Sequence, residues 1–312
     1  MSDKALGIDI GGTKIAVATV RAGVEILRET QIPTESERGF ASGVTRIAEA
    51  AAVVMRETGW NAADLVGIGV GCAGPVDPVR GTIHNPHTLP GWTGGNIVAA
   101  LGERFGCPVI LENDADMALF GESRAGAGRG FDPLVMLTFG TGIGGGALSS
   151  GKLLRGLGGE HPELGHVPVD PDGPPCYCGA RGCFESLASG SALNAVAQAQ
   201  GLGDARELLA CAAAGDAAAG LARGRALAAT ATAAWTIIHT LLPERIILGG
   251  GVMDEHYAPF AAAVSEALSR ATLIPAGRVD VARAELGNRA GLVGAASAIS
   301  SRMQAEQVIR AS

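Results

Sequence analysis

The sequence predicts an α/β fold with two related halves, and three observations support this prediction. Short apolar segments with the two-residue period of strands alternate along the chain with longer segments of helical period, which is the pattern of mixed α/β domains. Two glycine-rich turns, at residues 11–14 and 140–146, each join one strand pattern to another. The length of 312 residues suits about two domains.

The first half of the chain is predicted to hold a hairpin, two further strands and three helices. Apolar residues alternate on both sides of the turn at 11–14, which indicates two strands joined by a tight turn. Gly59 and Gly106 follow two helical patterns and stand where C-terminal caps belong. The predicted strands are 6–10, 15–20, 65–70 and 108–111. The predicted helices are 40–55, 98–105 and 115–124.

The second half repeats the strand–turn–strand pattern. Its turn at 140–146 matches G-x-G-x-x-G at Gly140, Gly142 and Gly145. A dinucleotide-binding fingerprint must open a helix, whereas residues 146–154 have the pattern of a second strand, so we reject that interpretation. The other strands are predicted at 134–139, 245–248 and 278–286. The helices are predicted at 191–214, 216–241, 254–270 and 288–306.

Composition and charge restrict the class of protein. A net charge of -7 and a pI near 5.4 argue against a nucleic-acid partner. Charged residues interrupt the long apolar stretches, so no window is suited to span a membrane, and the first residues lead into a strand pattern without a signal peptide. We therefore expect a cytoplasmic protein, in which clustered reduced cysteines favour metal binding over disulfides.

Residues 163–185 contain the ligands of a metal site. His166, Cys176, Cys178 and Cys183 supply one imidazole and three thiols within eighteen residues, which is the ligand set of a structural, four-coordinate zinc site. Prolines and glycines leave this loop with no helix or strand period, so a metal would supply the order that packing does not. The alternative is that the cysteines are scattered small apolar residues, but three of the six fall within eight positions.

The first glycine turn has the composition of a phosphate site. Gly11 and Gly12 allow positive φ values and bring bare backbone N–H groups close to an anion. Thr13 and Lys14 add a hydroxyl and a cation, and Asp9 would lie near phosphate only through a bridging Mg²⁺. Taken alone, a Gly-Gly-Thr segment is more often an ordinary hairpin turn.

Two further glycine-rich segments favour a nucleotide site over an ordinary turn. One is the second turn at 140–146, and the other is the run at 249–251, which follows a predicted strand. Lysine occurs only at positions 4, 14 and 152, so a lysine inside the first turn is notable in this chain.

Asp114 stands where a helix is predicted to begin. The positive end of the helix dipole keeps such a carboxylate ionised, which suits a residue that accepts a hydroxyl proton during phosphoryl transfer. The alternative is that Asn113 or Asp114 only caps the helix, and capping is compatible with catalysis. Glu163 and Glu185 flank the metal ligands, and carboxylates that accept paired hydroxyls suggest a sugar.

Five short motifs together cover nearly the whole chain. They are Asp9-Ile-Gly-Gly-Thr-Lys14, Glu112-Asn-Asp-Ala115, Gly140-Thr-Gly-Ile-Gly-Gly-Gly146, Glu163-Leu-Gly-His166 and Cys176-Tyr-Cys-Gly-Ala-Arg-Gly-Cys-Phe-Glu185. They resemble the ROK family of bacterial sugar kinases and sugar-responsive repressors, and the chain is glucokinase-like with some fructokinase-like features. The resemblance implies the two-lobed actin/hexokinase/Hsp70-like ATPase fold with a zinc-binding loop, with sugar between the lobes and ATP on the glycine turns.

The resemblance also implies roles for individual residues. Asp114 would be the catalytic base for the 6-hydroxyl of the sugar. The residues that would contact the sugar are Gly74, Pro75, Asn113, Asp114, Glu163, His166 and Glu185. The residues that would bind ATP are Asp9, Gly11, Gly12, Thr13, Lys14, Thr141, Gly142, Gly144, Gly249, Gly250 and Gly251. His166 would bind zinc with one ring nitrogen and face a sugar hydroxyl with the other.

The resemblance further implies lobes, cofactors and self-association. We expect residues 1–116 with 292–312 to form a small N-terminal lobe, and residues 117–291 to form a large lobe that contains the zinc-binding loop 163–185. A structural Zn²⁺ and the Mg²⁺ that accompanies ATP are the expected cofactors. The expected partners are a hexose, ATP and further copies of the chain in a homodimer or higher homo-oligomer.

Two departures from the family's glucokinases bear on the substrate. Thr88 stands where they usually have Asn, which weakens one expected sugar hydrogen bond. His161-Pro162 replaces the Gly that usually precedes Glu163, and His-Pro-Glu is similar to the fructose-phosphorylating branch. We expect ATP-dependent phosphorylation of a hexose at its 6-hydroxyl, with glucose to glucose 6-phosphate favoured. The alternatives are a fructokinase, a kinase for mannose and a kinase for N-acetylglucosamine or N-acetylmannosamine.

A non-catalytic sugar-sensing regulator or a zinc scaffold is the alternative of another class. Family repressors carry a helix-turn-helix before the first glycine turn, and the eight residues here are too few for one. A catalytically idle protein would not need both phosphate turns together with Asp9, Lys14 and Asp114. An enzyme is therefore the favoured interpretation.

Overall fold

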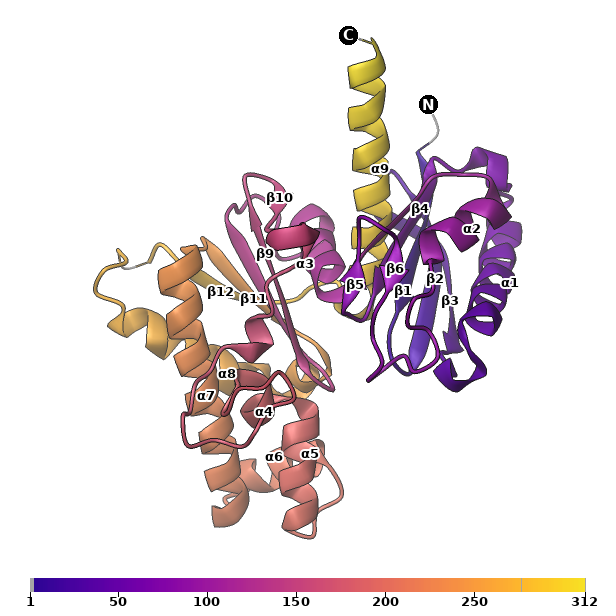
Figure 1. The fold of residues 1–312 in the computed structure, drawn as a ribbon. Helices are drawn as coiled ribbons and strands as arrows, with labels where there is room; N and C mark the ends of the chain where they lie inside the picture. Colours follow the sequence, from indigo (N-terminus) through magenta and orange to yellow (C-terminus); the bar gives the residue numbers. More distant parts are fainter. Residues whose placement is uncertain (1–2, 276, 312) are drawn as a thin grey trace. The chain divides into compact units, whose positions relative to one another are not determined.

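The chain folds into two α/β units, which Figure 1 colours along the sequence. The computed structural model describes residues 3–275 and 277–311. Of these, unit 1 comprises 3–130, 153–161 and 288–311, and unit 2 comprises 131–152, 162–275 and 277–287. The chain therefore passes between the units more than once, and the last helix returns to the first unit.

Unit 1 is built on a five-stranded sheet with the order β3-β2-β1-β4-β7. β1, β2 and β3 pair antiparallel in sequence, whereas β4 lies parallel to β1 and β7 parallel to β4. The strands are β1 Lys4–Ile10, β2 Lys14–Arg21, β3 Glu25–Pro33, β4 Gly67–Cys72 and β7 Val109–Asn113. A separate antiparallel pair is formed by β5 Val76–Asp77 and β6 Thr82–Ile83.

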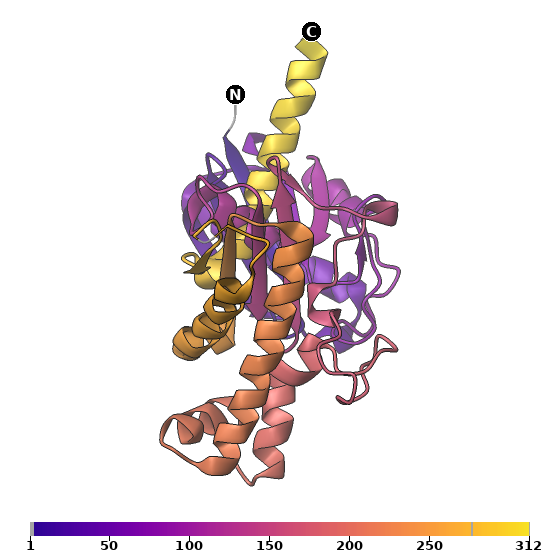
Figure 2. The same cartoon turned by 90° about the vertical axis from the view of Figure 1, so that its left-hand side faces the viewer.

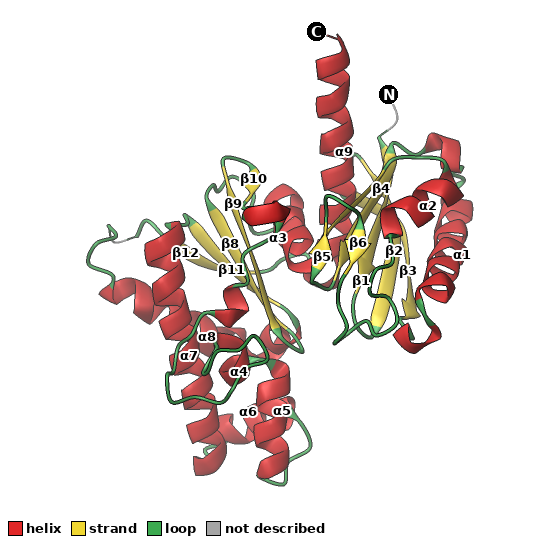
Figure 3. Ribbon diagram, viewed as in Figure 1, coloured by secondary structure: helices red, strands yellow, loops and turns green. Residues whose placement is uncertain are grey.

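Helices cover both faces of this sheet (Figure 3). The helices are α1 Phe40–Thr58, α2 Ile97–Phe105, α3 Asp114–Ala125 and α9 Ala290–Ala311. Because side chains alternate along a strand, Leu6 and Ile8 of β1 join the core under α1 and α2, while Ala5 joins the opposite core with Leu292 and Ile299 of α9. The sheet of unit 1 is thus buried on both faces.

Glycines let α9 approach the sheet and α3 at backbone distance. A Cβ on Gly69 of β4 would lie 1.8 Å from the carbonyl oxygen of Ala295, and a Cβ on Gly294 would lie 1.7 Å from that of Met117. No side chain fits at either position, so the close packing of α9 requires glycine there.

Unit 2 repeats the same strand order, β10-β9-β8-β11-β12. β9 is antiparallel to β8, β11 is parallel to β8, and β12 is parallel to β11, as in the corresponding strands of unit 1. The prediction of two related halves, each with a glycine turn in its first hairpin, is confirmed. The strands are β8 Leu134–Phe139, β9 Ile143–Ser149, β10 Lys152–Leu153, β11 Arg245–Gly249 and β12 Asp280–Arg283.

The helices of unit 2 share a large apolar core with its sheet. They are α4 Phe184–Ala188, α5 Gly190–Ala199, α6 Ala205–Ala213, α7 Ala217–Leu241 and α8 Gly251–Arg270. Phe139 at the end of β8 packs edge to face on Phe184 of α4 and Phe260 of α8, all three fully buried. Figure 2 shows the long helix α7 with α5 and α6 beside its first turns.

The structure corrects several predicted boundaries. The helix predicted at 191–214 is two helices, because Gly201 has a φ of 75° and Asp204 caps α6 with its carboxylate. β3 and α4 were not predicted. α8 begins at Gly251 rather than at 254, and the last strand is limited to β12.

The predicted lobe boundary after residue 116 falls inside α3. This helix packs along α9, so the whole of it belongs to unit 1, which continues to residue 130. Residues 153–161 also belong to unit 1, and its last segment begins at 288 rather than at 292. Within the described part of the chain, no helix has the length and hydropathy that crossing a bilayer requires.

Candidate active site and metal centre

The first glycine turn closes the β1–β2 hairpin of unit 1. The amide of Gly11 donates to the carbonyl of Lys14 over 3.0 Å. Thr34, fully buried after β3, fixes the turn from outside: its amide donates to the carbonyl of Thr13 over 3.0 Å and its hydroxyl to that of Gly11 over 2.7 Å. The shape of the turn is therefore set by the protein itself.

The glycines of this turn are closely packed and do not have positive φ. Sequence reasoning expected positive φ at Gly11 and Gly12, and this was wrong, since neither lies in the left-handed region. A Cβ on Gly12 would lie 3.1 Å from the Cβ of Thr88, and one on Gly11 would lie 3.2 Å from the oxygen of Lys14. A side chain at either position would require its neighbour to shift by a few tenths of an ångström.

Asp9 lies next to this turn on β1, with its carboxyl group against the first turn of α9. A Cβ on Gly291 would lie 2.9 Å from that carboxyl group. Burial raises the pKa of Asp9 to about 7, the Asp114 carboxylate adds to the rise, and Lys14 opposes it. Asp9 and Asp114 are thus close enough for their charges to interact, and a divalent cation bound there would favour the ionised form of both.

The carboxyl ends of β4 and β7 bring the predicted sugar residues of unit 1 together. Asn113 ends β7 and caps α3, because its amide oxygen accepts from the N–H groups of Ala115 (2.8 Å) and Asp116 (3.3 Å). Gly74, just after β4, lies against this side chain, since a Cβ there would be 2.8 Å from Nδ2 of Asn113. Asp114 is the first residue of α3 and is partly exposed. Asn113 thus performs the capping, and the Asp114 carboxylate remains at the positive end of the helix.

Asn85 organises the loop that contains Thr88, and sequence reasoning missed it. The buried amide of Asn85 donates to the carbonyl of Ala73 (3.1 Å) and to the hydroxyl of Thr88 (2.5 Å), and its oxygen accepts from the N–H groups of His87 and Thr88. The Thr88 hydroxyl therefore holds its own loop to the end of β4.

A buried ion-pair cluster lies behind Asp114 in unit 1. Arg155 contacts Asp116 over 2.9 Å and Glu112 over 2.5 Å, and Nδ1 of His161 lies 3.8 Å from Asp116. Burial raises the pKa of Asp116 to about 6, with Arg155 and His161 opposing the rise. His161 also stands near Gly74, 3.9 Å from the position of a Cβ there. The signal in the sequence was an aspartate on the apolar side of a helix.

The second glycine turn closes the β8–β9 hairpin of unit 2. The amide of Gly140 donates to the carbonyl of Gly142 over 2.9 Å. β11 runs parallel to β8, so its carboxyl end brings Gly249–Gly251 to the same edge of the sheet. Gly250 has a φ of 89°, and a Cβ there would lie 2.5 Å from the carbonyl oxygen of Phe139. The predicted ATP-binding glycines of unit 2 therefore form one continuous backbone surface.

Glu185 binds the backbone of this turn. Its Oε2 accepts from the amide of Ile143 over 2.8 Å, and a Cβ on Gly142 would lie 2.3 Å from the same oxygen. Glu185 was predicted as a sugar residue only. The structure shows that it also connects α4, which follows the metal loop, to the second glycine turn.

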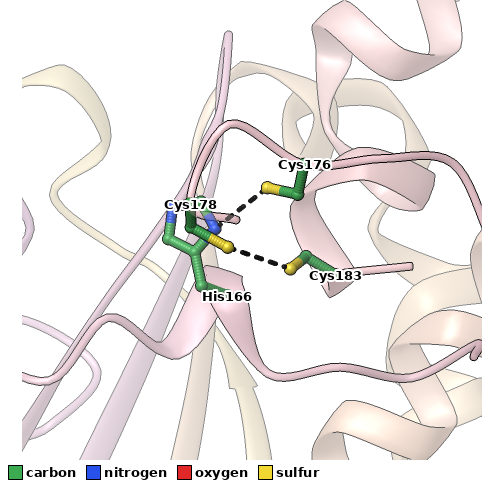
Figure 4. A group of neighbouring side chains, drawn as sticks. All are labelled: His166, Cys176, Cys178 and Cys183. Atoms are coloured by element: carbon green, nitrogen blue, oxygen red, sulfur yellow. Dashed lines mark hydrogen bonds between the residues drawn. The ribbon is translucent and has the colours of Figure 1, made fainter. Parts of the chain in front are cut away.

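The four predicted metal ligands converge in unit 2 (Figure 4). The ligand atoms of His166, Cys176, Cys178 and Cys183 all lie within 4.8 Å of one another. Sγ of Cys176 is 3.4 Å from Nδ1 of His166, and Sγ of Cys178 is 3.5 Å from Sγ of Cys183. Ligands of a tetrahedral zinc are about 3.8 Å apart for a zinc–sulfur bond of about 2.3 Å, so the donor set fits zinc.

The loop around these ligands has little packing of its own. Short contacts fold it, such as the amide of Cys176 donating to the carbonyl of Ala180 over 2.9 Å, and Cys183 is its only buried ligand. Burial and the neighbouring thiols raise the pKa of Cys183. A bound zinc would reverse that effect and order the loop.

His166 directs its two ring nitrogens to different surroundings. Nδ1 faces Cys176 and the other thiols, whereas Nε2 lies 3.0 Å from the hydroxyl of Tyr177. This arrangement is consistent with a metal bound at Nδ1 and a hydrogen bond from Nε2 to a group outside the metal centre.

The chain is similar to known proteins over most of its length. The family model described as "ROK family" matches residues 5–302. The chain belongs to the ROK family. Glucokinase of Thermotoga maritima is 35% identical over 96% of this chain and 98% of its own. N-acetylmannosamine kinase of Escherichia coli O157:H7 is 34% identical over 93% of this chain and 96% of its own.

A solved ROK structure extends the likeness to the fold. The ROK family glucokinase of Streptomyces griseus, in complex with glucose and AMPPNP, has a TM-score of 0.78 and 32% identity, covering 96% of this chain and 99% of that one. The predicted membership of the ROK family and the predicted actin/hexokinase-like α/β fold are confirmed.

The predicted site residues of this ROK protein are distributed over both units. Those in unit 1 are Asp9, Gly11, Gly12, Thr13, Lys14, Gly74, Pro75, Asn113 and Asp114. Those in unit 2 are Thr141, Gly142, Gly144, Glu163, His166, Glu185 and Gly249–Gly251, with the remaining metal ligands Cys176, Cys178 and Cys183. Within unit 1 most of them lie at the ends of strands, whereas unit 2 holds them in the glycine turns, the metal loop and the start of α4.

Proposed function

We propose that this ROK protein is an ATP-dependent hexose kinase that phosphorylates the 6-hydroxyl of glucose. The observation that carries the proposal is the placement of Asp114, a partly exposed carboxylate at the start of α3 whose charge acts on Asp9. Glucokinases at this level of identity over nearly the whole chain support the same activity here.

In the proposed reaction Asp114 accepts the proton of the sugar hydroxyl. The hydroxyl oxygen then forms a bond to the γ-phosphorus, the bond from that phosphorus to the bridging oxygen breaks, and ADP leaves. Asp9 would hold the Mg²⁺ that accompanies ATP, and that ion would neutralise the charge between the carboxylates and the phosphates. Lys14 and the backbone N–H groups of the first turn would bind phosphate oxygens.

Unit 2 would supply the second glycine turn for ATP and three groups for the sugar. Glu163 and Glu185 accept hydrogen bonds from paired hydroxyls, and the Nε2–H group of His166 donates one to a hydroxyl oxygen. Zinc at His166 and the three cysteines would fix the loop that carries these groups. Glu185 binds Ile143 of the glycine turn as well, so movement of the metal loop would also affect the nucleotide side.

A second candidate substrate is N-acetylmannosamine. The kinase of E. coli O157:H7 for this sugar is nearly as similar as the glucokinases, and Thr88 is exposed and shorter than the Asn expected there. A fructokinase remains the alternative that the His161-Pro162 pair suggests. Loss of a buried hydrogen bond costs about 1–3 kcal/mol, or roughly tenfold to hundredfold in affinity, which is enough to change the preferred sugar.

The test is an ADP-release assay with glucose, fructose, mannose, N-acetylglucosamine and N-acetylmannosamine under one set of conditions. We expect the highest kcat/KM for glucose, with activity dependent on Mg²⁺ and ATP. A value for another sugar more than tenfold above glucose would overturn the ranking. Absence of turnover with every hexose would instead support a sugar-sensing protein. Asp114→Asn serves as the control for contaminating kinases.

We further propose that the enzyme works in the cytoplasm as a homodimer or higher homo-oligomer. Three clustered thiols need a reducing compartment to remain metal ligands rather than disulfides. Sedimentation of the zinc-loaded protein tests the assembly.

A further inference from the structure

Tyr177 lies inside the metal loop, between the ligands Cys176 and Cys178. Its side chain is 71% exposed, yet the hydroxyl is not directed to solvent alone. Oη lies 3.0 Å from Nε2 of His166, and the phenol ring meets the imidazole edge to face with centroids 5.0 Å apart. The exposed phenol is thus held at a ligand of the proposed metal centre.

The surroundings of this hydroxyl are the residues that bind sugar in the proposed function. Besides His166, the carboxylates of Glu185 and Glu163 lie near enough to the phenol for their charges to act on it. Tyr177 therefore contacts His166 and lies near the two carboxylates that are assigned to the hexose.

His166 has one ring nitrogen available for a hydrogen bond, either to Tyr177 or to a sugar hydroxyl. Nδ1 faces the sulfur of Cys176, so Nε2 alone can bond outside the metal centre, and in this structure Tyr177 takes that bond. A sugar hydroxyl can reach Nε2 only after the phenol leaves. The backbone of Tyr177 is fixed by its two neighbouring ligands, but an exposed side chain can rotate about its own bonds at little cost.

We propose that Tyr177 is a substrate-discriminating residue, whose hydroxyl occupies the hydrogen-bonding position of the hexose at His166 and is displaced when the hexose binds. The inference rests on the proposed function and adds a residue to it. A ligand must offer hydroxyls that replace those of Tyr177, so the phenol lowers the affinity for every sugar and most for those that replace it poorly.

The first experiment compares wild type, Tyr177→Phe and Tyr257→Phe, each purified with zinc. Phenylalanine keeps the ring on His166 and removes the competing hydroxyl. Because a hydrogen bond contributes about 0.5–1.5 kcal/mol, we expect glucose to bind Tyr177→Phe roughly twofold to tenfold more tightly by calorimetry without ATP. KM for glucose should fall by the same factor, with little change in kcat, KM for ATP or zinc content.

Tyr257→Phe is the matched control. Tyr257 is the other tyrosine of the chain, lies on α8 and directs its hydroxyl to the carbonyl of Val281. Its substitution should leave the affinity for glucose unchanged. Unchanged or weaker glucose binding in Tyr177→Phe, with zinc retained and wild type active, would overturn the inference while leaving the kinase in place. A wild type that neither binds nor phosphorylates a hexose would overturn the proposed function instead.

A second experiment needs no variant at position 177. With two tyrosines in the chain, labelling their rings with ¹³C gives two sets of NMR signals, which Tyr257→Phe assigns. Glucose should shift the signals of Tyr177 in the zinc-loaded protein and leave those of Tyr257 unchanged. Signals of Tyr177 that do not move at saturating glucose would contradict displacement.

Discussion

The guanidinium of Arg155 lies 2.9 Å from a carboxylate oxygen of Asp116 that solvent does not reach. Asp116 follows Asp114 by two residues on α3. Arg155 belongs to a segment of unit 1 that follows the first strands of unit 2 in the sequence. The same guanidinium contacts Glu112 on β7. Arg155 therefore ties residues 153–161 to the strand and helix that present the proposed catalytic base.

Removing this guanidinium should destabilise unit 1. Breaking one side of a buried ion pair typically costs about 3–5 kcal/mol, because the remaining charge stays buried without its partner. We expect Arg155→Met to lower the free energy of unfolding, measured in urea, by an amount of that order. The control is Arg38→Met, which breaks the exposed pair with Glu35 and should cost about 1 kcal/mol or less. Equal midpoints for the two variants would show that Asp116 does not depend on Arg155.

Asp116 should also produce a pH dependence of stability. Its pKa is about 6 in the folded chain, against an ordinary 3.8, because burial outweighs Arg155 and His161, and Glu112 and Asp114 add to the rise. The folded state thus holds this proton more tightly than the unfolded state. The contribution of Asp116 to the free energy of unfolding is most favourable below pH about 4 and is lost as pH rises to about 6.

Asp116→Asn should remove that decline. We expect the difference in Tm between Asp116→Asn and wild type to increase in favour of the variant from pH 4 to pH 6.5 and then to stay constant. The exposed Asp3→Asn protein is the control, measured over the same range. A difference that does not vary with pH would contradict the assignment of the shift to Asp116.

The metal loop should contain about one zinc per chain. We expect elemental analysis to find this zinc in wild type and in Cys211→Ser, whose cysteine lies outside the loop, but not in Cys178→Ser. Chelation should lower Tm and abolish glucose binding, because Glu163 and Glu185 stand next to ligands in the sequence. Zinc content unchanged in Cys178→Ser would rule out the Cys₃His site.

Asp114→Asn should separate catalysis from folding. Asn113 continues to cap α3 in this variant, so Tm and glucose affinity should stay close to wild type. Loss of a general base typically lowers kcat by about 10²–10⁴. Asp216→Asn, which alters an aspartate at the start of α7, should keep full activity. If Asp114→Asn retains more than about a tenth of the wild-type kcat, another group takes the proton.

Local patterns predicted the parts of the site that are close in sequence. The four metal ligands fall within one loop, and the two glycine turns each follow a regular strand, so spacing alone identified them. β3 was missed because it is the edge strand of its sheet and most of its residues keep some exposure, which weakens the apolar alternation. α4 was missed because five residues are too short for a helical period.

Contacts between distant segments could not be predicted. Nothing in the sequence relates Arg155 to Asp116, or Glu185 to the amide of Ile143, because such pairs depend on how strands and loops are placed in space. The close packing of Gly12 is also a contact between distant segments, because a Cβ there would lie 3.1 Å from the Cβ of Thr88. The orientation of Tyr177 likewise depends on the folded loop.

The packing of α9 on unit 1 can form only after nearly the whole chain has been synthesised. The sheet formed by the first 113 residues has one face on which α9 packs, through contacts such as Gly69 with Ala295. A ribosome that adds about 5–20 residues per second needs roughly ten to thirty seconds to proceed from the end of α3 to α9. During that interval the apolar residues that pack against α9 in the finished fold, Ala5 and Ile110 among them, lack this partner.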